Sequence, residues 1–309
     1  MSSVAFIYDP IYLEHDTGAY HPETADRLRS ILRAIEPLHE RLLFIEPEPS
    51  PLDLIVQVHP SYHIEFIEEK SLHQEPIDSD TQVSSKSFDA ALVAVGAGKS
   101  AVDSIIAGDI KSAFCALRPP GHHATSNQAM GFCLFNNIAI TARYAQSMGY
   151  EKVMIIDFDV HHGNGTQEIF YEDSSVFYFS THQYPAYPGT GSYEERGSGE
   201  GEGFTHNFPM RAYSGDDDVL PIYEDDLLLD IEAFNPDIIL VSAGYDLHKA
   251  DPLAQLQVTT EGIRKIVEAI MRSSEVPKIF MLEGGYNLDA LGESVAETLD
   301  AMLSTEELV

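Results

Sequence analysis

The stretch KVMIIDFDVHHGNGTQ, residues 152–167, joins an apolar run to a cluster of ionisable side chains. Asp157, Asp159, His161 and His162 lie within six residues, and a loop with two glycines follows them. Burying an unpaired charge is costly, so the end of a buried strand rarely carries several such groups without partners. The stretch therefore predicts either a hydrogen-bonded network or a bound cation at the end of a buried strand.

Other apolar runs alternate with helical patterns along the chain. The predicted strands are 112–117, 152–157, 175–180, 237–244 and 278–285. The predicted helices are 24–36, 87–107, 135–148, 220–233, 260–273 and 289–303. Near-continuous apolar strands separated by helices are typical of a parallel sheet that is covered on both faces. We therefore expect an α/β fold with a predominantly parallel β-sheet flanked by helices on both faces.

A polar cluster follows each of the five predicted strands. In chain order these clusters read RPPGHH, DFDVHH, STHQY, AGYD and EGGY. Open α/β sheets bind their ligands beyond the carboxyl ends of the strands. The five clusters therefore predict an active site at this edge of the sheet.

The chain is expected to form a single domain over residues 1–309. Its hydrophobic content of 44% is enough for a large core. No internal repeat is evident. The polar segments 46–51, 68–82 and 189–203 are predicted to be loops, and none has the character of a linker between independent domains.

Charge and cysteine content limit the classes of partner. Fifty acidic and 18 basic residues give a net charge of −32, too acidic for sequence-independent binding to nucleic-acid phosphates. This charge would attract cationic substrates, although an acidic surface for solubility explains it equally well. The sequence contains no run of about 18 apolar residues and no secretory signal pattern, so we expect no membrane association. With only Cys115 and Cys133, a reduced, cytoplasmic protein is expected, and a homo-oligomer is left open.

Three residues form a candidate metal site. Asp159 and His161 are two residues apart, so their side chains point the same way in an extended segment. Asp246, which follows another predicted strand, offers a third ligand. Two carboxylates and one imidazole with an open position are typical of a catalytic metal site. Zn²⁺ fits, and the oxygen-rich set would also accept Fe²⁺ or Mn²⁺.

The adjacent histidines His122 and His123 are candidates for proton transfer. The preceding PPG segment supplies a rigid turn that can present both rings to one cavity. Asp157 and Asn164 are available to orient the rings. A carboxylate partner favours the imidazolium, whereas an amide partner leaves a ring freer to exchange protons near neutral pH. Tyr286, after the double glycine of EGGY, could bring a phenolic donor over the metal.

The chain resembles the histone deacetylase family, which has the arginase–deacetylase fold, and is most similar to its class II and bacterial deacetylase-like branch. The motifs that carry the resemblance span most of the chain: HPETADRL (21–28), RPPGHHA, MGFCLFNN (130–137), DFDVHHGNGTQ, YPGTGS (187–192), SAGYD…DPL and EGGY. Asn164, where class I members carry Asp, favours class II.

The resemblance implies a role for each matching catalytic position. The zinc ligands would be Asp159, His161 and Asp246. His122 matches the histidine that is paired with a buried aspartate, here Asp157, and His123 matches the general base and acid. Tyr286 matches the tyrosine that polarises the acetyl carbonyl.

The resemblance also implies a substrate tunnel. Phe132 and Tyr187 match its two aromatic walls, and Gly131 matches the residue whose carbonyl binds the substrate amide. Leu253 aligns with a rim position where polyamine-specific members of the family place Glu.

Two sites for monovalent cations are implied in the same way. A structural K⁺ site would use Asp157, Asp159, His161, Ser180 and Thr181. A second site would use main-chain carbonyls of Phe170, Asp173 and Val176.

We therefore predict a zinc-dependent amidohydrolase that removes acetyl groups from lysine side chains of proteins or peptides and releases acetate. A deacetylase of small acetylated amines, such as acetylpolyamines, would use the same chemistry and is the main alternative. A catalytically weak binder of acylated ligands is disfavoured by the intact set of candidate residues. A binuclear ureohydrolase is a further rival, because His248 and Asp251 lie near Asp246 in the sequence.

Overall fold

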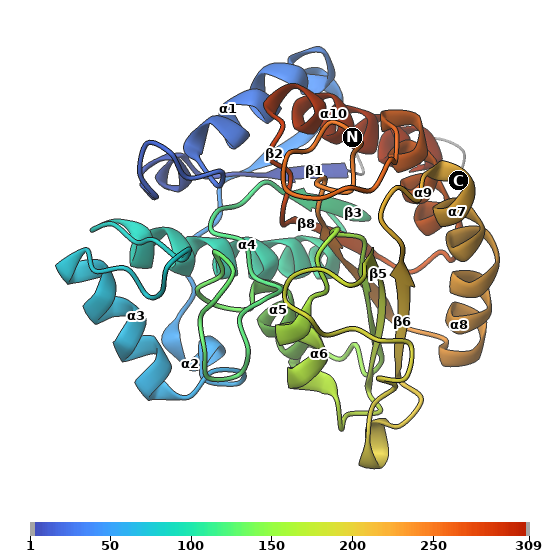
Figure 1. The fold of residues 1–309 in the computed structure, drawn as a ribbon, viewed down its shortest axis with the longest axis horizontal. Coiled ribbons are helices and arrows are strands. Elements are labelled where there is room, and N and C mark those ends of the chain that lie inside the picture. The colour runs from blue at the N-terminus through green and yellow to red at the C-terminus, as the bar shows by residue number, and fades with distance from the viewer. Residues whose placement is uncertain (1–3, 307–309) are drawn as a thin grey trace.

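The central element of the computed structural model, which describes residues 4–306, is an eight-stranded sheet (Figure 1). Its strands are β1 (Val4–Ile7), β2 (Leu43–Ile45), β3 (Ser112–Cys115), β4 (Val153–Asp157), β5 (Val176–Gln183), β6 (Thr205–Met210), β7 (Ile238–Ala243) and β8 (Lys278–Leu282). They lie in the order β2-β1-β3-β8-β7-β4-β5-β6, and every neighbouring pair is parallel. The predicted parallel sheet is confirmed.

The five predicted strands correspond to β3, β4, β5, β7 and β8, and all their residues are buried. Three further strands were not predicted. Strand β2 is three residues long and partly exposed, and β6 contains Pro209, which an edge strand tolerates because its missing N–H faces no neighbour. β1 and β2 are apolar but only four and three residues long, and β6 mixes polar with apolar residues, so none of the three has the longer apolar run on which the prediction relied.

Helices cover both faces of the sheet, as expected (Figure 1). The α-helices are α1 (Ala25–Ala34), α2 (Leu52–Ile55), α3 (Ser61–His73), α4 (Ser87–Ala107), α5 (Asn137–Ser147), α6 (Asn164–Phe170), α7 (Asp216–Pro221), α8 (Leu227–Phe234), α9 (Thr260–Arg272) and α10 (Leu288–Glu306). A π-helical segment (Ile222–Asp226) joins α7 to α8, and short 3-10 helices span Pro10–Leu13, Glu36–Arg41 and Gly199–Gly201. Helices α1, α9 and α10 pack together on one side of the sheet, and α4 packs against α5 on the other.

The prediction of a loop over 68–82 is wrong at its beginning, because α3 continues to His73. The apolar residues Ile64 and Ile67 are spaced three apart and face the interior, whereas the charged residues 68–70 lie outside that buried stripe. The loop over 46–51 is confirmed, and 189–203 contains only the short 3-10 turn.

Helix α4 has the length and apolar composition of a membrane-spanning helix. The sequence prediction found no such segment because Asp89, Lys99 and Asp103 interrupt it. However, 61% of the apolar stretch of this helix is buried inside the domain. There the helix packs against α5 and the central strands. Its apolar composition is therefore accounted for by the core.

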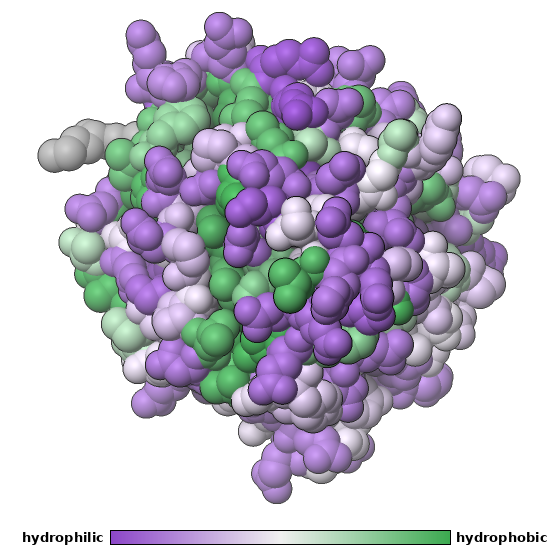
Figure 2. Space-filling model, turned by 90° about the vertical axis from the view of Figure 1, so that its left-hand side faces the viewer, coloured by the Kyte–Doolittle hydropathy of each residue, from purple (hydrophilic) through white to green (hydrophobic). Residues whose placement is uncertain are grey.

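The face of the molecule that carries α3 is largely hydrophilic, with hydrophobic side chains gathered near its middle (Figure 2). Tyr62 and Phe66 of α3 are among the exposed large apolar residues, at 60% and 39% of full exposure. An exposed apolar cluster with a polar surround is a feature of binding surfaces.

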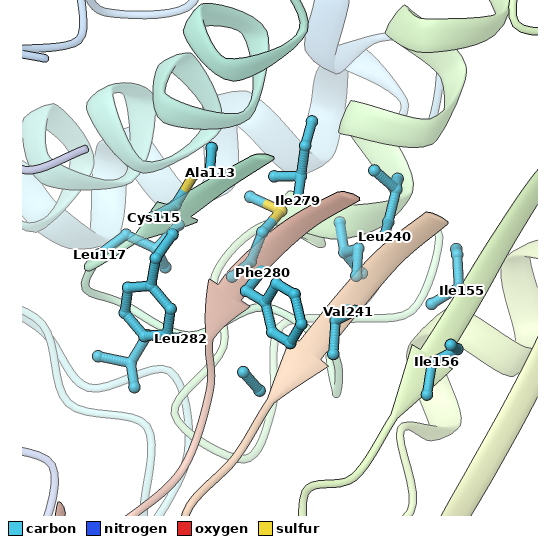
Figure 3. Packing of buried hydrophobic residues seen from close by; sticks show 14 of the residues in the cluster. Ala113, Cys115, Leu117, Ile155, Ile156, Leu240, Val241, Ile279, Phe280 and Leu282 are labelled. Atoms are coloured by element: carbon cyan, nitrogen blue, oxygen red, sulfur yellow. The ribbon is translucent and has the colours of Figure 1, made fainter. Parts of the chain in front are cut away.

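The sheet is packed on both of its faces (Figure 3). Successive residues alternate between the two sides, so Ile279 lies on one face and Phe280 on the other. Both are fully buried, as are Leu240 and Val241 on the neighbouring strand. A sheet held in this way fixes the positions of the loops that leave its carboxyl edge.

Candidate active site

The predicted polar clusters meet at the carboxyl edge of the sheet. RPPGHH lies beyond β3, DFDVHH begins at the last residue of β4, and the clusters with Asp246 and Tyr286 follow β7 and β8. The cluster STHQY is an exception. Ser180 and Thr181 lie within β5, which continues to Gln183 because β6 pairs with this extension.

The candidate metal ligands Asp159, His161 and Asp246 come together as one group. One ligand atom from each lies within 4.8 Å of the others. The Nδ1 atom of His161 is 3.3 Å from Asp159 Oδ1 and 3.1 Å from Asp246 Oδ2. These two carboxylates raise the pKa of His161 to about 10, against the effect of its burial.

Backbone N–H groups orient both carboxylates. Asp159 accepts hydrogen bonds from the N–H groups of His161 and Gly284, each at 2.8 Å, and Asp246 accepts one from Val160 at 3.0 Å. Burial opposes ionisation of Asp159, but the charges of His122 and His161 outweigh it and lower its pKa. These hydrogen bonds hold the two carboxylates close together, and Asp159 is held ionised, whereas burial and the charge of Asp159 raise the pKa of Asp246.

Two glycines allow the backbone to approach these carboxylates. A Cβ atom at Gly244 would lie 2.0 Å from Asp159 Oδ2, and one at Gly284 would lie 2.2 Å from Asp246 Oδ2. Such distances are too short for any side chain. The space, the buried setting and the two-carboxylate, one-imidazole set fit a catalytic divalent metal ion.

The two adjacent histidines have different partners. His122 Nδ1 is 3.0 Å from Asp157 Oδ2, whereas His123 Nδ1 is 2.8 Å from Asn164 Oδ1. Burial would lower the pKa of His122, but nearby carboxylates, chiefly Asp159 and Asp157, hold it well above its usual value. Burial and the neighbouring imidazoles hold the pKa of His123 well below its usual value. His123 is therefore neutral near pH 7, so its ring has a nitrogen free to act as a base toward a reacting group.

The residues predicted for the first K⁺ site also lie together. Asp157 and Ser180 are paired in register across β4 and β5. Thr181 follows Ser180 directly, and Asp159 and His161 lie in the segment that leaves β4. The carboxylate of Asp157 accepts hydrogen bonds from Tyr178 and from the N–H of Asp159, both at 3.1 Å.

The residues predicted for the second cation site, Phe170, Asp173 and Val176, span the end of α6 and the start of β5. The carbonyl of Phe170 already accepts a hydrogen bond from the N–H of Asp173.

A pocket of about 200 Å³ leads to the candidate metal ligands. Its lining includes all of the predicted substrate residues, Gly131, Phe132, Tyr187 and Leu253, together with His122, His123, His161 and Tyr286. It also includes Asp80, Pro120, Cys133 and Gly284, which the sequence analysis did not assign to it. Asp80 lies in a polar loop without a motif, so no signal in the sequence could have assigned it.

Two consecutive residues in the lining of this pocket have a left-handed backbone conformation. Gly131 and Phe132 both have positive φ, +55° and +71°, and a Cβ atom at Gly131 would lie 2.7 Å from the ring of His123. The ring of His21 packs against Phe132 at 4.6 Å, and its Nε2 contacts the carbonyl of Asp80 at 2.8 Å. His21 therefore supports the rim.

Tyr286 lies next to Arg27, which belongs to a fully buried cluster of charged side chains with Glu23 and Arg118. The guanidinium of Arg27 lies 5.1 Å from the centre of the Tyr286 ring and donates to the carbonyls of Gly285 and Glu283. Glu23 in turn pairs with both Arg27 and Arg118. Arg27 braces the loop that carries Tyr286, and burial with nearby carboxylates raises the pKa of Tyr286 so that it keeps its proton.

Asp251 accepts hydrogen bonds from the backbone at two rim loops. Its Oδ2 atom accepts from the N–H of Tyr286 at 2.6 Å, and its Oδ1 atom accepts from Leu253 at 3.0 Å. His248 bonds instead with Thr260 at 3.2 Å. Within residues 4–306, the group able to hold a metal does not include Asp251 or His248, so nothing supports a binuclear site.

We expect Asp251→Ala to lower kcat by about tenfold, because loss of the Tyr286 N–H partner frees that loop. In a Tyr286→Phe background the same substitution should have little further effect. Measuring kcat for the four proteins of this double-mutant cycle checks the coupling. If kcat of the double variant falls by the product of the two single-variant factors, Asp251 does not act through Tyr286.

Known proteins resemble this chain along most of its length. A family model described as the histone deacetylase domain matches residues 21–302. The chain is 42% identical over 315 residues to "Histone deacetylase 10, chloroplastic" of Oryza sativa subsp. japonica, covering 93% of this chain and 71% of that protein. It is 36% identical over 291 residues to a "Probable deacetylase" of Archaeoglobus fulgidus, covering 92% and 81%. The crystal structure of the HDA15 HD domain superposes with a TM-score of 0.94 at 36% identity, covering 98% of this chain and 88% of that one.

Proposed function

Because this chain belongs to the histone deacetylase family, a family of hydrolases that act on amide bonds, we propose that it removes acetyl groups from lysine side chains of proteins or peptides in a zinc-dependent reaction. The observation that carries the proposal is the convergence of the three candidate metal ligands with two differently paired histidines at the end of one pocket. The products would be acetate and a free lysine amine.

The proposed reaction divides the work among the residues of the pocket. A divalent ion held by Asp159, His161 and Asp246 would supply a Lewis acid that polarises the acetyl carbonyl and lowers the pKa of water toward about 7. His123 Nε2 takes the proton of the attacking water and then gives it to the leaving amine. The Tyr286 hydroxyl donates a hydrogen bond to the oxygen on which negative charge develops.

His122 has a different part in this proposal. The charges of Asp159 and of its partner Asp157 keep it protonated, so it supplies positive charge next to the reacting groups rather than exchanging protons. Asn164, as a neutral partner, orients His123 without holding a proton on it.

The pocket walls would orient the substrate. Phe132 and Tyr187 line the pocket and would enclose the methylenes of the acyl-lysine, and the carbonyl of Gly131 would accept a hydrogen bond from the substrate amide. This enclosure would shield the methylenes from bulk solvent and leave room for the attacking water at the end of the pocket.

Several finer assignments belong to the same proposal. We infer Zn²⁺ as the catalytic ion, with Fe²⁺ or Mn²⁺ as substitutes, and structural K⁺ bound near Asp157 and Ser180. The catalytic domain is taken to span residues 1–309, with acetylated proteins or peptides as partners. A cytoplasmic location is supported by the two cysteines, which are both free and buried.

Small acetylated amines are the second candidate substrate, and the acidic charge of −32 favours them. Leu253 argues against them. It is 42% exposed and lines the pocket, where it offers apolar contact but no carboxylate for a distant ammonium group. We therefore expect higher kcat/KM for acetyl-lysine peptides than for acetylpolyamines at moderate ionic strength, when general attraction is screened. A strong preference of the unmodified protein for acetylspermidine would contradict this choice of substrate.

Leu253→Glu should shift the ratio of kcat/KM toward acetylpolyamines by roughly two- to fivefold, the range of a partly exposed ion pair. The measurement compares both substrates with both proteins, and Leu253→Gln serves as the uncharged control. A ratio that is the same for the Glu and Gln variants would remove the charge argument.

A further inference from the structure

A second cavity lies beside the pocket that contains the candidate metal ligands. Its volume is roughly 450 Å³, and Tyr62 and Phe66 of α3 line it together with Ile77, Asp78 and Ala129. This cavity is here called the α3 groove, and two of its lining residues, Tyr62 and Phe66, are exposed large apolar side chains. None of the roles proposed above uses it.

The α3 groove and the main pocket share two walls. Along one chain segment, Asp78 lines the groove and Asp80 lines the pocket. Along another, Ala129 lines the groove and Gly131 lines the pocket. Two residues of extended chain span at most about 7 Å, so the two cavities are neighbours at the same rim.

Hydrogen bonds hold one of these walls in place. Asp78 Oδ1 accepts from the N–H groups of Asp80 at 3.1 Å and Thr81 at 2.7 Å. The hydroxyl of Thr81 accepts from the N–H of Phe132 at 3.3 Å, which ties the wall to the opposite side of the pocket. The groove is therefore a formed feature of the rim.

The chemistry of the groove selects an apolar occupant. Tyr62, Phe66, Ile77 and Ala129 form its apolar part, and Tyr62 and Phe66 remain exposed. The rest of the lining is polar and consists of His63, Asp78, Asn127 and Gln128. Asp78 and Asp80, at the boundary between the two cavities, add negative charge that complements a basic peptide and disfavours an acidic one.

A substrate peptide can reach both cavities at once. Neighbouring Cα atoms are 3.8 Å apart, and residues two positions apart are separated by about 7 Å in an extended chain. When an acetyl-lysine enters the main pocket, a side chain one or two positions away thus lies at the distance of the groove.

We propose that the α3 groove binds a large apolar side chain located one or two residues from the acetyl-lysine of a peptide substrate. This inference rests on the proposed function, and it names a sequence preference that a small acetylated amine cannot satisfy. Partial burial of one phenyl ring should tighten binding by about five- to tenfold.

The test uses acetyl-lysine peptides in which the two residues on each side are Gly or, at one position at a time, Phe. Dissociation constants are measured by fluorescence anisotropy with the zinc-loaded Tyr286→Phe protein, in which hydrolysis is slow. At least one Phe peptide should bind about five- to tenfold more tightly than the all-Gly peptide. Equal affinity of all five peptides would overturn the proposal.

Variants localise the effect. The single variant Phe66→Ala and the double variant Tyr62→Ala, Phe66→Ala should each bind the Phe peptide and the all-Gly peptide with more nearly equal affinity. Leu72→Ala is the matched control, because Leu72 lies on the same helix, is 70% exposed and is not part of the groove lining. A ratio that survives the double substitution would place the preference elsewhere and reject the groove.

Failure of the underlying function gives a different result. Turnover of free acetyl-lysine amide by the unmodified zinc-loaded protein tests that function alone. The affinity ratio among peptides is measured without turnover, so it judges the groove independently.

Discussion

Replacing Asp246 with Ala is expected to abolish both metal binding and amide hydrolysis. Asp246 supplies one of the three ligands in the candidate metal group, and its Oδ2 atom lies 3.1 Å from the Nδ1 atom of a second, His161. Two remaining ligands do not make a stable site for a divalent ion. Without the Lewis acid, neither carbonyl polarisation nor water ionisation is assisted, so the rate should fall to background.

The measurement is the metal content per protein molecule, together with acetate release from an acetyl-lysine peptide. Asp217→Ala is a suitable control, because it removes an exposed carboxylate of α7 and should leave both quantities unchanged. Thermal melting should establish that the Asp246→Ala protein is folded. Stoichiometric zinc in that folded variant would show that Asp246 is not a ligand.

Tyr286→Phe is expected to lower kcat by roughly 10²–10³ while the metal content stays constant. The substitution removes one hydroxyl donor to the developing oxyanion and leaves the ring contacts with Phe132 and Arg27 available. KM should change less than kcat, because the donor acts mainly on charge that develops in the transition state.

Steady-state kinetics on one peptide substrate, with metal analysis of the same samples, checks this separation of roles. Tyr213→Phe, at a site that is 71% exposed, is the control for loss of a hydroxyl. His123→Ala should also retain its metal while losing proton transfer. If either the Tyr286 or the His123 variant loses zinc in proportion to protein, that residue is a ligand and its assigned role is wrong.

The central sheet was predictable because its strands are buried on both faces. β4 and β7 pair residue by residue from Val153 with Ile238 to Asp157 with Ser242, and this packing requires near-continuous apolar runs. The end of β5 was not predictable in the same way. Its last residues include His182, whose ring is fully buried. The burial is tolerated because both ring nitrogens form hydrogen bonds, one with Ser180 and one with the carbonyl of Gly191.

The partners of the histidine pair were also accessible from sequence. Asp157 and Asn164 were expected to orient the two rings because their motif lies at the same edge of the sheet, and the structure brings both within 3.0 Å. These contacts follow from the alignment of strand ends in a parallel sheet.

A role for Arg27 in bracing a loop could be predicted from sequence, but its partners could not. Arg27 reaches the carbonyl of Gly285 across 258 positions of sequence, and Arg118 reaches Glu23 across 95. Their burial depends on the packing of the whole domain. Glu23, Arg27 and Arg118 lie in motifs that carry the family resemblance, but those motifs do not reveal that the three side chains are buried together, since arginine and glutamate are more commonly found at the surface.

Zinc-dependent deacetylation is best tested by acetate release from an acetyl-lysine peptide, measured with protein that has been stripped by a chelator and then titrated with Zn²⁺. We predict background release from the stripped protein and full activity at one equivalent of zinc per chain. Hydrolysis by the metal-free protein at the rate of the zinc-loaded protein would contradict the account, as would the absence of acetate release after full loading.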